Sequence, residues 1–422
     1  MREVPLDAVI LGGGIAGLWT LNRAVDAGYN AILLEQDRLG GIQTIRSQGI
    51  IHGGIKYALH GALTTTASAI AHMPARWRAC LAGTGEIDLR PTRILSDAHY
   101  LWSKDSLGAR MTAFFASRAL QGRISPTSPE ERPALFRNDR FRGSVYRLNE
   151  LVLDVESLIR TLAGPMAHRI FRAGPDDYRL EVSTGADSAG EITALTLPAH
   201  NLSLHPKRII LCCGEGYEQL ASRLSLSTPR MQRRPLHMVM ARFPRGAEAF
   251  PSTDALLPLS PLSPPSPLYA HHLSGAPRPR ITITSHYARD GALVWYLGGE
   301  IAESGVERDR KAQIEQTKNT LRELLPWVSL HGARWATLRV DRAEPRQSTL
   351  TLPDSAFVQP HKNLIIAWPT KLALAPDLAE RVLAACLPPA GRENPAALPA
   401  ELEVLPRPAI AEPVWERAFD SD

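Results

Sequence analysis

A glycine-rich turn close to the N-terminus constrains the fold of this chain more than any other feature. The apolar run Ala8–Leu11 predicts a buried strand, and Gly12, Gly14 and Gly17 follow it in the spacing Gly-x-Gly-x-x-Gly. The first glycine permits a tight turn, the second lets a pyrophosphate approach the backbone, and the third lets the next helix lie against the strand. Strand, turn and helix in this order predict a dinucleotide-binding unit.

An acidic residue after the second strand supports the same interpretation. A helix is expected over Ala16–Ala27, ending at Gly28, a residue type typical of the position after a helix. The next apolar run, Ala31–Leu34, brings Glu35 to the end of a second strand, where a carboxylate can bind both hydroxyls of an adenine ribose. A glycine-rich turn without a ligand is the alternative, but it requires neither this helix nor this acid.

The composition is that of an ordinary globular protein with room for two or three domains. The chain has 422 residues, of which 44% are hydrophobic and 22% charged. No apolar run approaches the length of a membrane span and the N-terminus has no apolar signal segment, so neither a transmembrane segment nor secretion is expected. The spacing of the cysteines predicts no metal site and a reducing, cytoplasmic location. They are Cys80, Cys212, Cys213 and Cys386.

The net charge of +5 is spread along the chain rather than concentrated in one segment. Arg230, Arg233 and Arg234 form the densest basic group, and no aromatic residues are interleaved with them. A solvated loop beside a strand explains this group better than nucleic-acid binding does, so no nucleic-acid partner is expected. The positive balance favours an anionic small-molecule substrate through electrostatic steering.

Apolar periodicity predicts further helices and strands without an internal repeat. A continuous apolar strand at Arg208–Cys213 leads into Gly214-Glu215-Gly216 and a helix, which is a second signal of a parallel sheet. The loop Pro251–Pro279 is either a lid or surface padding, and the tail from Leu387 is an extended arm or partly disordered. Strands are expected at Pro235–Phe243, Arg280–His286, Ala292–Gly298 and Asn363–Ala367, and helices at Ala62–Leu81, Ser106–Leu120, Leu151–Leu162, Arg310–Leu325 and Asp377–Cys386.

Four stretches of the chain resemble, in the same order, the flavin-dependent enzymes grouped with D-amino-acid oxidase, glycine oxidase and sarcosine oxidase. They are the glycine motif ending at Glu35, the passage Gly41–Ile55, the strand and turn Ile209–Gly216, and Trp335–Pro345 together with Asn363–Pro376. The passage Gly41–Ile55 is also similar to L-2-hydroxyglutarate oxidase and glycerol-3-phosphate dehydrogenase. The resemblance covers most of residues 5–386.

This resemblance implies an α/β fold in which a discontinuous Rossmann-like FAD-binding domain is joined to an α+β substrate domain with an antiparallel sheet. FAD is therefore the expected cofactor, and a proline-rich arm is expected to follow the two domains. The assigned residues are 1–78, 150–220 and 331–386 for the FAD-binding domain, 79–149 and 221–330 for the substrate domain, and 387–422 for the C-terminal arm.

The passage after Gly41 has a physical reason to follow such a cofactor. FAD is long and its isoalloxazine lies far from the first helix, so the chain must run beside it as backbone. Thr44, Arg46 and Ser47 can donate hydrogen bonds to pyrophosphate and ribitol oxygens, and Gly49 leaves room for a flat ring. A polar surface loop is the alternative. The expected FAD-binding residues are Gly12, Gly14, Ile15, Ala16, Gly17, Glu35, Gln36, Thr44, Arg46, Ser47, Gln48, Gly49, Ile170, Gly214, Gly216, Trp368, Thr370, Lys371 and Leu372.

Arg339 matches the position at which many members of the family place an arginine that binds the substrate carboxylate. A bidentate pair of this kind would aim the substrate carbon at flavin N5. The family usually has Arg-Pro there, whereas Val340 follows here. A structural pairing of Arg339 with Asp341 or Glu344 is an equal alternative.

The closing loop departs further from the family, because Trp368, Thr370, Lys371 and Ala373 stand where relatives have several glycines. Lys371 and the N-terminus of the next helix are expected to stabilise the negative charge of the reduced ring. The bulky Trp368 indicates a reshaped pocket, which puts the ordinary amino-acid substrates in doubt.

His52 stands where the hydroxy-acid relatives have a histidine beside the ring. It is either an acceptor of a substrate proton or a hydrogen-bonding spacer. Lys56 follows it closely, and Tyr296 lies on an expected strand of the substrate domain. With Arg339, these three residues are the substrate-binding candidates, and His52, Arg339 and Lys371 are the catalytic candidates.

The residues and the resemblance together predict an FAD-dependent oxidase or dehydrogenase of the glycine oxidase type. It would take a hydride from a carbon bearing an amine, in an amino acid or a secondary amine, and pass the electrons to oxygen or a quinone. Two alternatives stay open. One is oxidation of a 2-hydroxy acid or polyol phosphate, favoured by the run Ile51–Ile55, and the other is a flavoprotein that has lost turnover. An NAD(P)-linked dehydrogenase fits less well, since it does not need the passage after Gly41.

Overall fold

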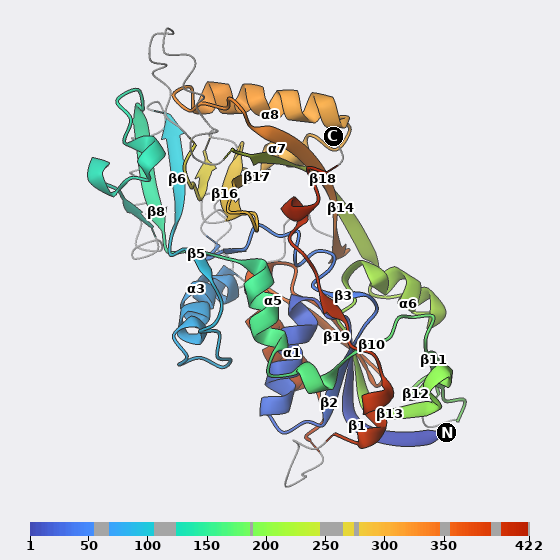
Figure 1. The fold of residues 1–422 in the computed structure, drawn as a ribbon. Coiled ribbons are helices and arrows are strands. Elements are labelled where there is room, and N and C mark those ends of the chain that lie inside the picture. The colour runs from blue at the N-terminus through green and yellow to red at the C-terminus, as the bar shows by residue number, and fades with distance from the viewer. Residues whose placement is uncertain are drawn as a thin grey trace.

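Two sheets form two lobes of an elongated molecule (Figure 1). The computed structural model describes residues 1–54, 67–104, 124–185, 189–244, 265–273, 278–346, 355–389 and 398–420. The expected helix Ser106–Leu120, the candidate Lys56 and most of the loop Pro251–Pro279 lie outside these residues. The observed architecture confirms the expected α/β class with a second, mainly antiparallel sheet.

The first sheet has a parallel centre, as the nearly continuous apolar runs predict. β1 (Arg2–Leu11) pairs in parallel with β2 (Ala31–Glu35) on one side and with β13 (Leu202–Leu211) on the other. Two further strands extend the parallel centre and three add antiparallel pairs. They are β10 (Ile170–Arg172), β20 (Leu364–Trp368), β11 (Arg179–Val182), β12 (Ile192–Leu197) and β19 (Phe357–His361).

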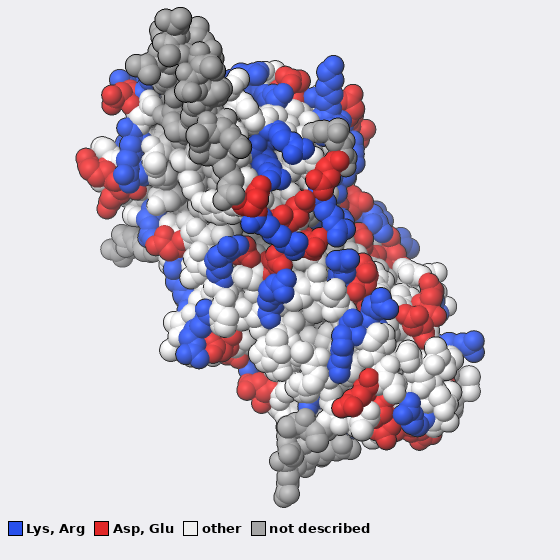
Figure 2. All heavy atoms as spheres, viewed as in Figure 1, with Lys and Arg blue, Asp and Glu red and all other residues white. Residues whose placement is uncertain are grey.

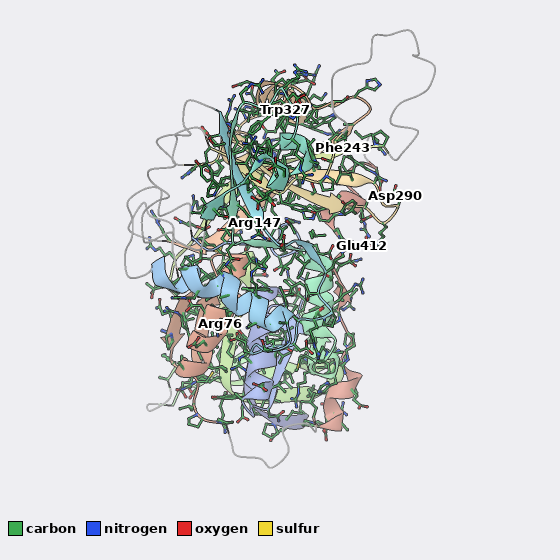
Figure 3. The ribbon with its side chains drawn as sticks, turned by 90° about the vertical axis from the view of Figure 1, so that its left-hand side faces the viewer. Arg76, Arg147, Phe243, Asp290, Trp327 and Glu412 are labelled. Carbon is green, nitrogen blue, oxygen red and sulfur yellow. The ribbon has the colours of Figure 1, made fainter. Side chains whose placement is uncertain are left out.

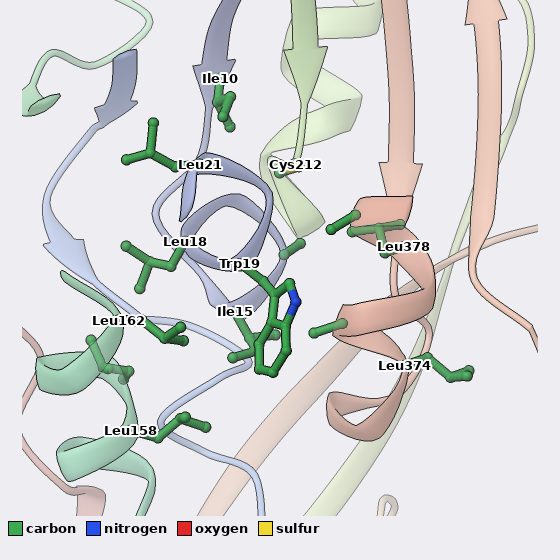
Figure 4. Close-up of a cluster of buried hydrophobic side chains, with 14 of the residues drawn as sticks. Ile10, Ile15, Leu18, Trp19, Leu21, Leu158, Leu162, Cys212, Leu374 and Leu378 are labelled. Carbon is green, nitrogen blue, oxygen red and sulfur yellow. The ribbon is translucent and has the colours of Figure 1, made fainter. Parts of the chain in front are cut away.

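Helices cover both faces of this sheet, so the sheet lies between two packed cores. Leu18 and Trp19 of α1 are fully buried between the sheet and neighbouring helices (Figure 4). Truncating one such side chain to alanine costs about 2–5 kcal/mol of stability. The helices of this lobe are α1 (Ile15–Asp26), α3 (Ala67–Leu81), α5 (Val155–Ala163), α6 (Tyr217–Arg223) and α9 (Ala375–Ala385).

One predicted helix is shorter than expected, because its first residues form a strand. Leu151–Leu153 is β9, which pairs with β4 (Ile50–Ile51) and with β5 (Ile94–Ser96). The helix α5 begins only at Val155, because the Asp154 carboxylate accepts a hydrogen bond from the Ser157 backbone N–H at 2.8 Å and caps the N-terminus. The prediction of a helix over Leu151–Leu162 was therefore wrong at its start.

The second sheet is antiparallel except for one parallel pair, β6 with β15. Phe243 and Trp327 lie in the core on one of its faces, beneath α8 (Arg310–Leu324) (Figure 3). The domain assignment expected from the sequence placed β18 in the FAD-binding domain. In the structure β18 pairs along its whole length with β14 and belongs to this second sheet. In order the strands are β18 (Arg334–Pro345), β14 (Met231–Arg242), β17 (Leu293–Gly298), β16 (Thr282–Tyr287), β15 (Ala270–His272), β6 (His99–Lys104), β8 (Gly143–Leu148) and β7 (Ile124–Pro126).

Short elements complete the two lobes. The helix α7 (Glu300–Glu303) follows β17 directly, and 3₁₀ turns connect several strands to helices. The 3₁₀ turns are η2 (Pro129–Glu131), η3 (Ala134–Phe136), η4 (Ala167–Arg169), η5 (Pro198–His200), η6 (Gly214–Gly216) and η9 (Leu372–Leu374).

The described part of the C-terminal arm is packed against both lobes (Figure 1). Its strand β21 (Ala409–Ile410) pairs in parallel with β3 (Arg38–Leu39) in the first lobe. Farther along, Trp415 and Phe419 are buried against the second sheet. The arm also contains the 3₁₀ turns η10 (Ala400–Val404) and η11 (Val414–Glu416).

The surface charge is mixed. Lysine and arginine side chains alternate with aspartate and glutamate over the face shown in Figure 2. This distribution agrees with the dispersed charge expected from the sequence. Within the described parts of the chain, no helix combines the length and the apolar character needed to cross a bilayer.

Candidate functional site

A cavity of about 940 Å³ lies where the two lobes meet. One wall is formed at the carboxyl ends of β1, β2, β13 and β20, and the other by β14, β17 and β18. Open α/β sheets bind ligands at this edge, where the strand order reverses. The volume is at the upper end of the range for small-molecule sites.

The glycine-rich turn forms the floor of this cavity and could not be built with larger residues. Gly12 has a φ of +108°, and a Cβ on it would lie 2.5 Å from the Cys212 carbonyl oxygen. A Cβ on Gly17 would lie 1.9 Å from the Gly12 carbonyl oxygen, so only glycine lets α1 approach β1 this closely. Gly14 provides no side-chain cap to the N-terminus of α1, and helix N-termini of this kind are suited to bind an anion.

Glu35 lies at the end of β2 on the cavity wall, as the sequence predicts. Its carboxylate accepts hydrogen bonds from the backbone N–H groups of Gly13 at 2.6 Å and Asp37 at 3.0 Å. Burial raises the pKa of this carboxyl above its ordinary value, and the backbone donors oppose the shift. A carboxylate held in this way is positioned to accept hydrogen bonds from two ribose hydroxyls.

The loop after Gly41 runs along the cavity and joins the two lobes. The Gln48 side chain donates a hydrogen bond to the Tyr296 carbonyl oxygen at 2.9 Å, and the Tyr296 hydroxyl donates to the Arg46 carbonyl oxygen at 2.9 Å. Thr44 Oγ1 accepts a hydrogen bond from the Ile15 N–H at 3.0 Å. These contacts fix the loop between the first helix and the second sheet.

Comparison with known proteins identifies the family of the chain. The sequence pattern of the DAO family, described as FAD-dependent oxidoreductase, matches residues 7–367. A probable FAD-dependent oxidoreductase from Pseudomonas aeruginosa is 49% identical over 423 residues, covering 99% of each chain. The chain belongs to the DAO family of FAD-dependent oxidoreductases. FAD is its cofactor, and it is an oxidoreductase.

Solved structures share the fold of this DAO-family protein. The Pseudomonas aeruginosa protein superposes with a TM-score of 0.79 and 43% identity over 99% of both chains. Glycine oxidase from Geobacillus kaustophilus, with a TM-score of 0.58 and 14% identity, covers 90% of this chain and 95% of its own. L-α-Glycerophosphate oxidase from Mycoplasma pneumoniae, with FAD bound, has a TM-score of 0.59 and 13% identity over 94% and 100%. At these identities the last two show the fold alone.

The residues on the cavity wall fit FAD. Ser47 Oγ and Trp368 Nε1 are buried without a hydrogen-bond partner among the described residues, and both residues line the cavity. Buried polar atoms of this kind require a partner, which a polar ligand would supply. Most of the predicted FAD-binding residues also line the cavity: Gly12, Gly14, Ile15, Ala16, Glu35, Gln36, Thr44, Arg46, Ser47, Gln48, Gly49, Gly214, Gly216, Trp368, Thr370, Lys371 and Leu372.

His52 lies on the same wall, and its ring is tied to a buried acid. Its Nδ1 lies 3.1 Å from Glu150 Oε2, and the Glu150 side chain is 1% exposed. The other carboxylate oxygen accepts a hydrogen bond from the Gly53 N–H at 2.7 Å. Burial raises the pKa of Glu150, but the neighbouring His52 and His99 and the Gly53 N–H together lower it to about 2. Glu150 is therefore an anion at neutral pH.

The second lobe contributes a cluster of charges to the cavity. Arg278 pairs with Glu303, and Arg342 Nη2 lies 3.8 Å from the other oxygen of the same carboxylate. Lys371 lines the cavity from the opposite lobe, next to η9 and the start of α9. The cavity wall therefore carries charges of both signs, with Glu303 between the two arginines.

Arg339 does not lie in the cavity, which corrects its predicted role. It is exposed, and its guanidinium donates to the carbonyl oxygens of Val306 at 2.6 Å and Arg308 at 2.9 Å. Successive residues of a strand face opposite sides, so Val340 and Arg342 line the cavity and Arg339 faces away. The structural alternative for Arg339 was the better one, although its partners are carbonyl groups rather than acids.

Three other predicted residues support the site without lining it. Gly17 acts through the close approach of α1 to β1. Ile170 is buried in the core of the first lobe, and Ala173, three residues later, lines the cavity instead. Tyr296 is fully buried and supports the loop at Arg46 rather than facing a substrate.

Sequence reasoning missed Glu150, Arg342 and the pair of Arg278 with Glu303. Glu150 directly precedes the apolar run Leu151–Leu153, and its side chain is buried. Acidic residues are rarely buried unless they are paired, so an acid beside such a run was a local signal. Arg342 could have been found from strand alternation once the direction of one side chain in β18 was known. Arg278 and Glu303 are brought together only by the second sheet.

Proposed function

We propose that this protein oxidises a small anionic substrate at a carbon bearing an amine, with FAD accepting the hydride at N5, as an enzyme of the glycine oxidase type. The observation that carries the proposal is the convergence of His52 and several cationic side chains on one cavity. Such cations bind a carboxylate and hold the reacting carbon in place. The cationic residues are Arg38, Arg46, Arg278, Arg342 and Lys371, of which Arg278 and Arg342 lie beside Glu303.

Three of these side chains have separate parts in the proposal. Arg342 takes the orienting role that the sequence had assigned to Arg339, because it lies on the cavity side of β18. His52 accepts the proton released by the substrate heteroatom. Lys371 supplies positive charge where reduced FAD carries negative charge. FAD supplies the two-electron chemistry when bound, and oxygen or a quinone is the proposed acceptor.

Oxidation of a 2-hydroxy acid or polyol phosphate is the second candidate. The contact between His52 and the ionised Glu150 favours it. A hydroxyl group must lose its proton as its carbon loses a hydride, so it needs a positioned base. An amine first loses its ammonium proton to water and is then more readily oxidised than an alcohol, so it depends less on this base. We also propose a cytoplasmic location, because the four cysteines are free thiols.

Anaerobic mixing of the FAD-loaded protein with a substrate panel tests both candidates. The panel contains amino acids, secondary amines, 2-hydroxy acids and polyol phosphates, with neutral amines and alcohols of similar size as controls. Fast loss of the flavin absorbance with an anionic amine supports the first candidate, and with a hydroxy acid or polyol phosphate the second. If dithionite bleaches the flavin but no panel member does, both are contradicted and the protein has lost turnover.

A further inference from the structure

We infer that Glu150 is a positioning residue that makes His52 the proton acceptor of the cavity. This inference rests on the proposed function for its chemistry, but its structural part stands on the contacts of Glu150 alone. Glu150 belongs to neither the glycine motif nor the loop beside the cofactor, and it does not line the cavity. It acts through His52.

The backbone fixes the two residues side by side. In the antiparallel pair of β4 and β9, Ile51 lies opposite Leu151, so the next residue of one strand and the preceding residue of the other are also neighbours. These residues are His52 and Glu150. The Gly53 N–H donates to Glu150 Oε1 at 2.7 Å, while Oε2 lies 3.1 Å from His52 Nδ1. One carboxylate therefore holds both the backbone and the ring of the loop.

The charge on Glu150 determines which nitrogen of His52 can act as a base. An ionised carboxylate only accepts hydrogen bonds, so Nδ1 of His52 must carry a proton. In the neutral ring the lone pair is then on Nε2. The buried negative charge of Glu150 also stabilises the imidazolium that forms when Nε2 takes up a proton.

Other aromatic, charged and apolar groups surround the His52 ring. The His271 ring is stacked on that of His52 with centroids 5.9 Å apart, and the His99 ring follows at 4.1 Å from His271. His271 Nδ1 lies 2.7 Å from Thr282 Oγ1. Lys371 is the cationic group of the segment next to η9, which packs on β4. α3, which also packs on β4, presents the apolar residues Ile70 and Pro74 to the glycines after His52.

The proton balance of the step is simple. The N–H or O–H bond of the substrate breaks, and its proton moves to Nε2 of His52. The hydrogen on the neighbouring carbon leaves with its two electrons, which FAD takes up as the oxidant. Glu150 stays ionised throughout and stabilises the imidazolium that forms.

The nitrogen signals of the FAD-loaded protein test the inference without a substrate. Histidine labelled with ¹⁵N reports which ring nitrogen carries the proton, and His52→Gln identifies the signal of His52. We expect the neutral ring to carry its proton on Nδ1 in the wild-type protein. A proton on Nε2 instead would overturn the inference, and this measurement does not depend on whether any Glu150 variant folds.

The variant Glu150→Gln removes the charge but retains an oxygen that can accept the Gly53 N–H. We expect the midpoint of the His52 titration to fall by about one pH unit or more. The control Asp97→Asn removes an exposed charge at the junction of β5 and β6 and should leave the midpoint unchanged, because exposed charges are screened. An equal midpoint in wild type and Glu150→Gln would contradict the inference.

Flavin reduction supplies the functional readout with a substrate from the panel. We expect Glu150→Gln to reduce FAD about tenfold more slowly at pH 7 and to move the acidic limb of the pH profile downward, with unchanged FAD binding. If no panel member reduces the flavin, the proposed function fails while the nitrogen signals still decide the role of Glu150.

One possible metal-ligand atom each of His52, Glu150 and His271 lies within 4.8 Å of the others. A stoichiometric divalent metal that is lost in Glu150→Gln would therefore overturn the inference.

Discussion

The indole ring of Trp415 stacks on the imidazole ring of His286, with their centroids 4.2 Å apart. Trp415 belongs to the C-terminal arm, and His286 to β16 in the second sheet. Six residues before Trp415, the arm pairs with β3, and the chain continues from β3 into Gly40 and Gly41 on the cavity wall. The arm therefore joins the second sheet to the loop that runs along the cavity.

Removing the indole should loosen this connection. Trp415 is 3% exposed, so Trp415→Ala should lower the free energy of unfolding by about 3–5 kcal/mol. We also expect faster loss of FAD on dilution, because β3 loses a restraint. Thermal unfolding and flavin fluorescence measure the two effects. Val404→Ala, which truncates an exposed side chain of the same arm, is the control and should change neither by much. Equal thermal stability and equal rates of FAD loss in the two variants would contradict this role of the stacked rings.

The same contact predicts how stability depends on pH. Burial lowers the pKa of His286 to about 3, against an ordinary value of 6.5. Below pH 6.5 the unfolded chain binds a proton at this residue that the folded protein does not, so stability falls with falling pH. The contribution of His286 is about 1.4 kcal/mol per pH unit between pH 6.5 and 3.

Denaturant titrations at pH 7 and pH 5 measure this dependence. His286→Gln should remove one titrating group from the pH dependence of the unfolding free energy. The variant should therefore lose less stability than the wild-type protein between the two pH values. His331→Gln changes an exposed histidine and should retain the wild-type slope. A slope in His286→Gln as steep as in the wild type would contradict the assignment.

The sequence was sufficient to predict the first lobe and most of the residues on its side of the cavity, because local rules determine them. The contact of 1.9 Å that a Cβ on Gly17 would make with Gly12 shows why the glycine spacing is informative. The carboxylate of Glu35 is where the end of a second strand must bring it. These features depend on a few neighbouring residues and on one βαβ geometry.

The errors came from strand direction and from contacts between distant segments. The side of β18 on which Arg339 lies depends on the register between β14 and β18, which one sequence does not reveal. Glu150 contacts His52 across 98 residues, through a ladder of two very short strands. The start of α5 was predictable, since Asp154 is a typical N-cap residue, but the apolar run before it was assigned to the helix.

Arg339 and Arg342 form a matched pair of variants on opposite faces of one strand. Arg342→Met should raise the KM for an anionic substrate by about ten- to a hundredfold, because it removes a charged hydrogen-bond donor from the cavity. Arg339→Met should leave KM unchanged and lower the thermal midpoint, since it removes the hydrogen bonds to Val306 and Arg308.

Steady-state kinetics and thermal unfolding of both variants check this assignment. FAD absorbance should stay at the wild-type level in each, which separates substrate binding from cofactor binding. The opposite result, a raised KM in Arg339→Met alone, would return the orienting role to Arg339 and would mean that β18 has another register in solution.

Lys371 gives a prediction about the reduction potential of the bound flavin. It lines the cavity next to η9 and α9, so its charge should stabilise reduced FAD more than oxidised FAD. Lys371→Met should therefore make the two-electron midpoint potential more negative by about 30 mV, which corresponds to about 1.4 kcal/mol. Reduction in the presence of a reference dye measures the shift. Lys362→Met, which removes an exposed lysine that donates to the Ala189 carbonyl oxygen, is the control. A shift of the same size in both variants would mean that general surface charge, rather than the position of Lys371, sets the potential.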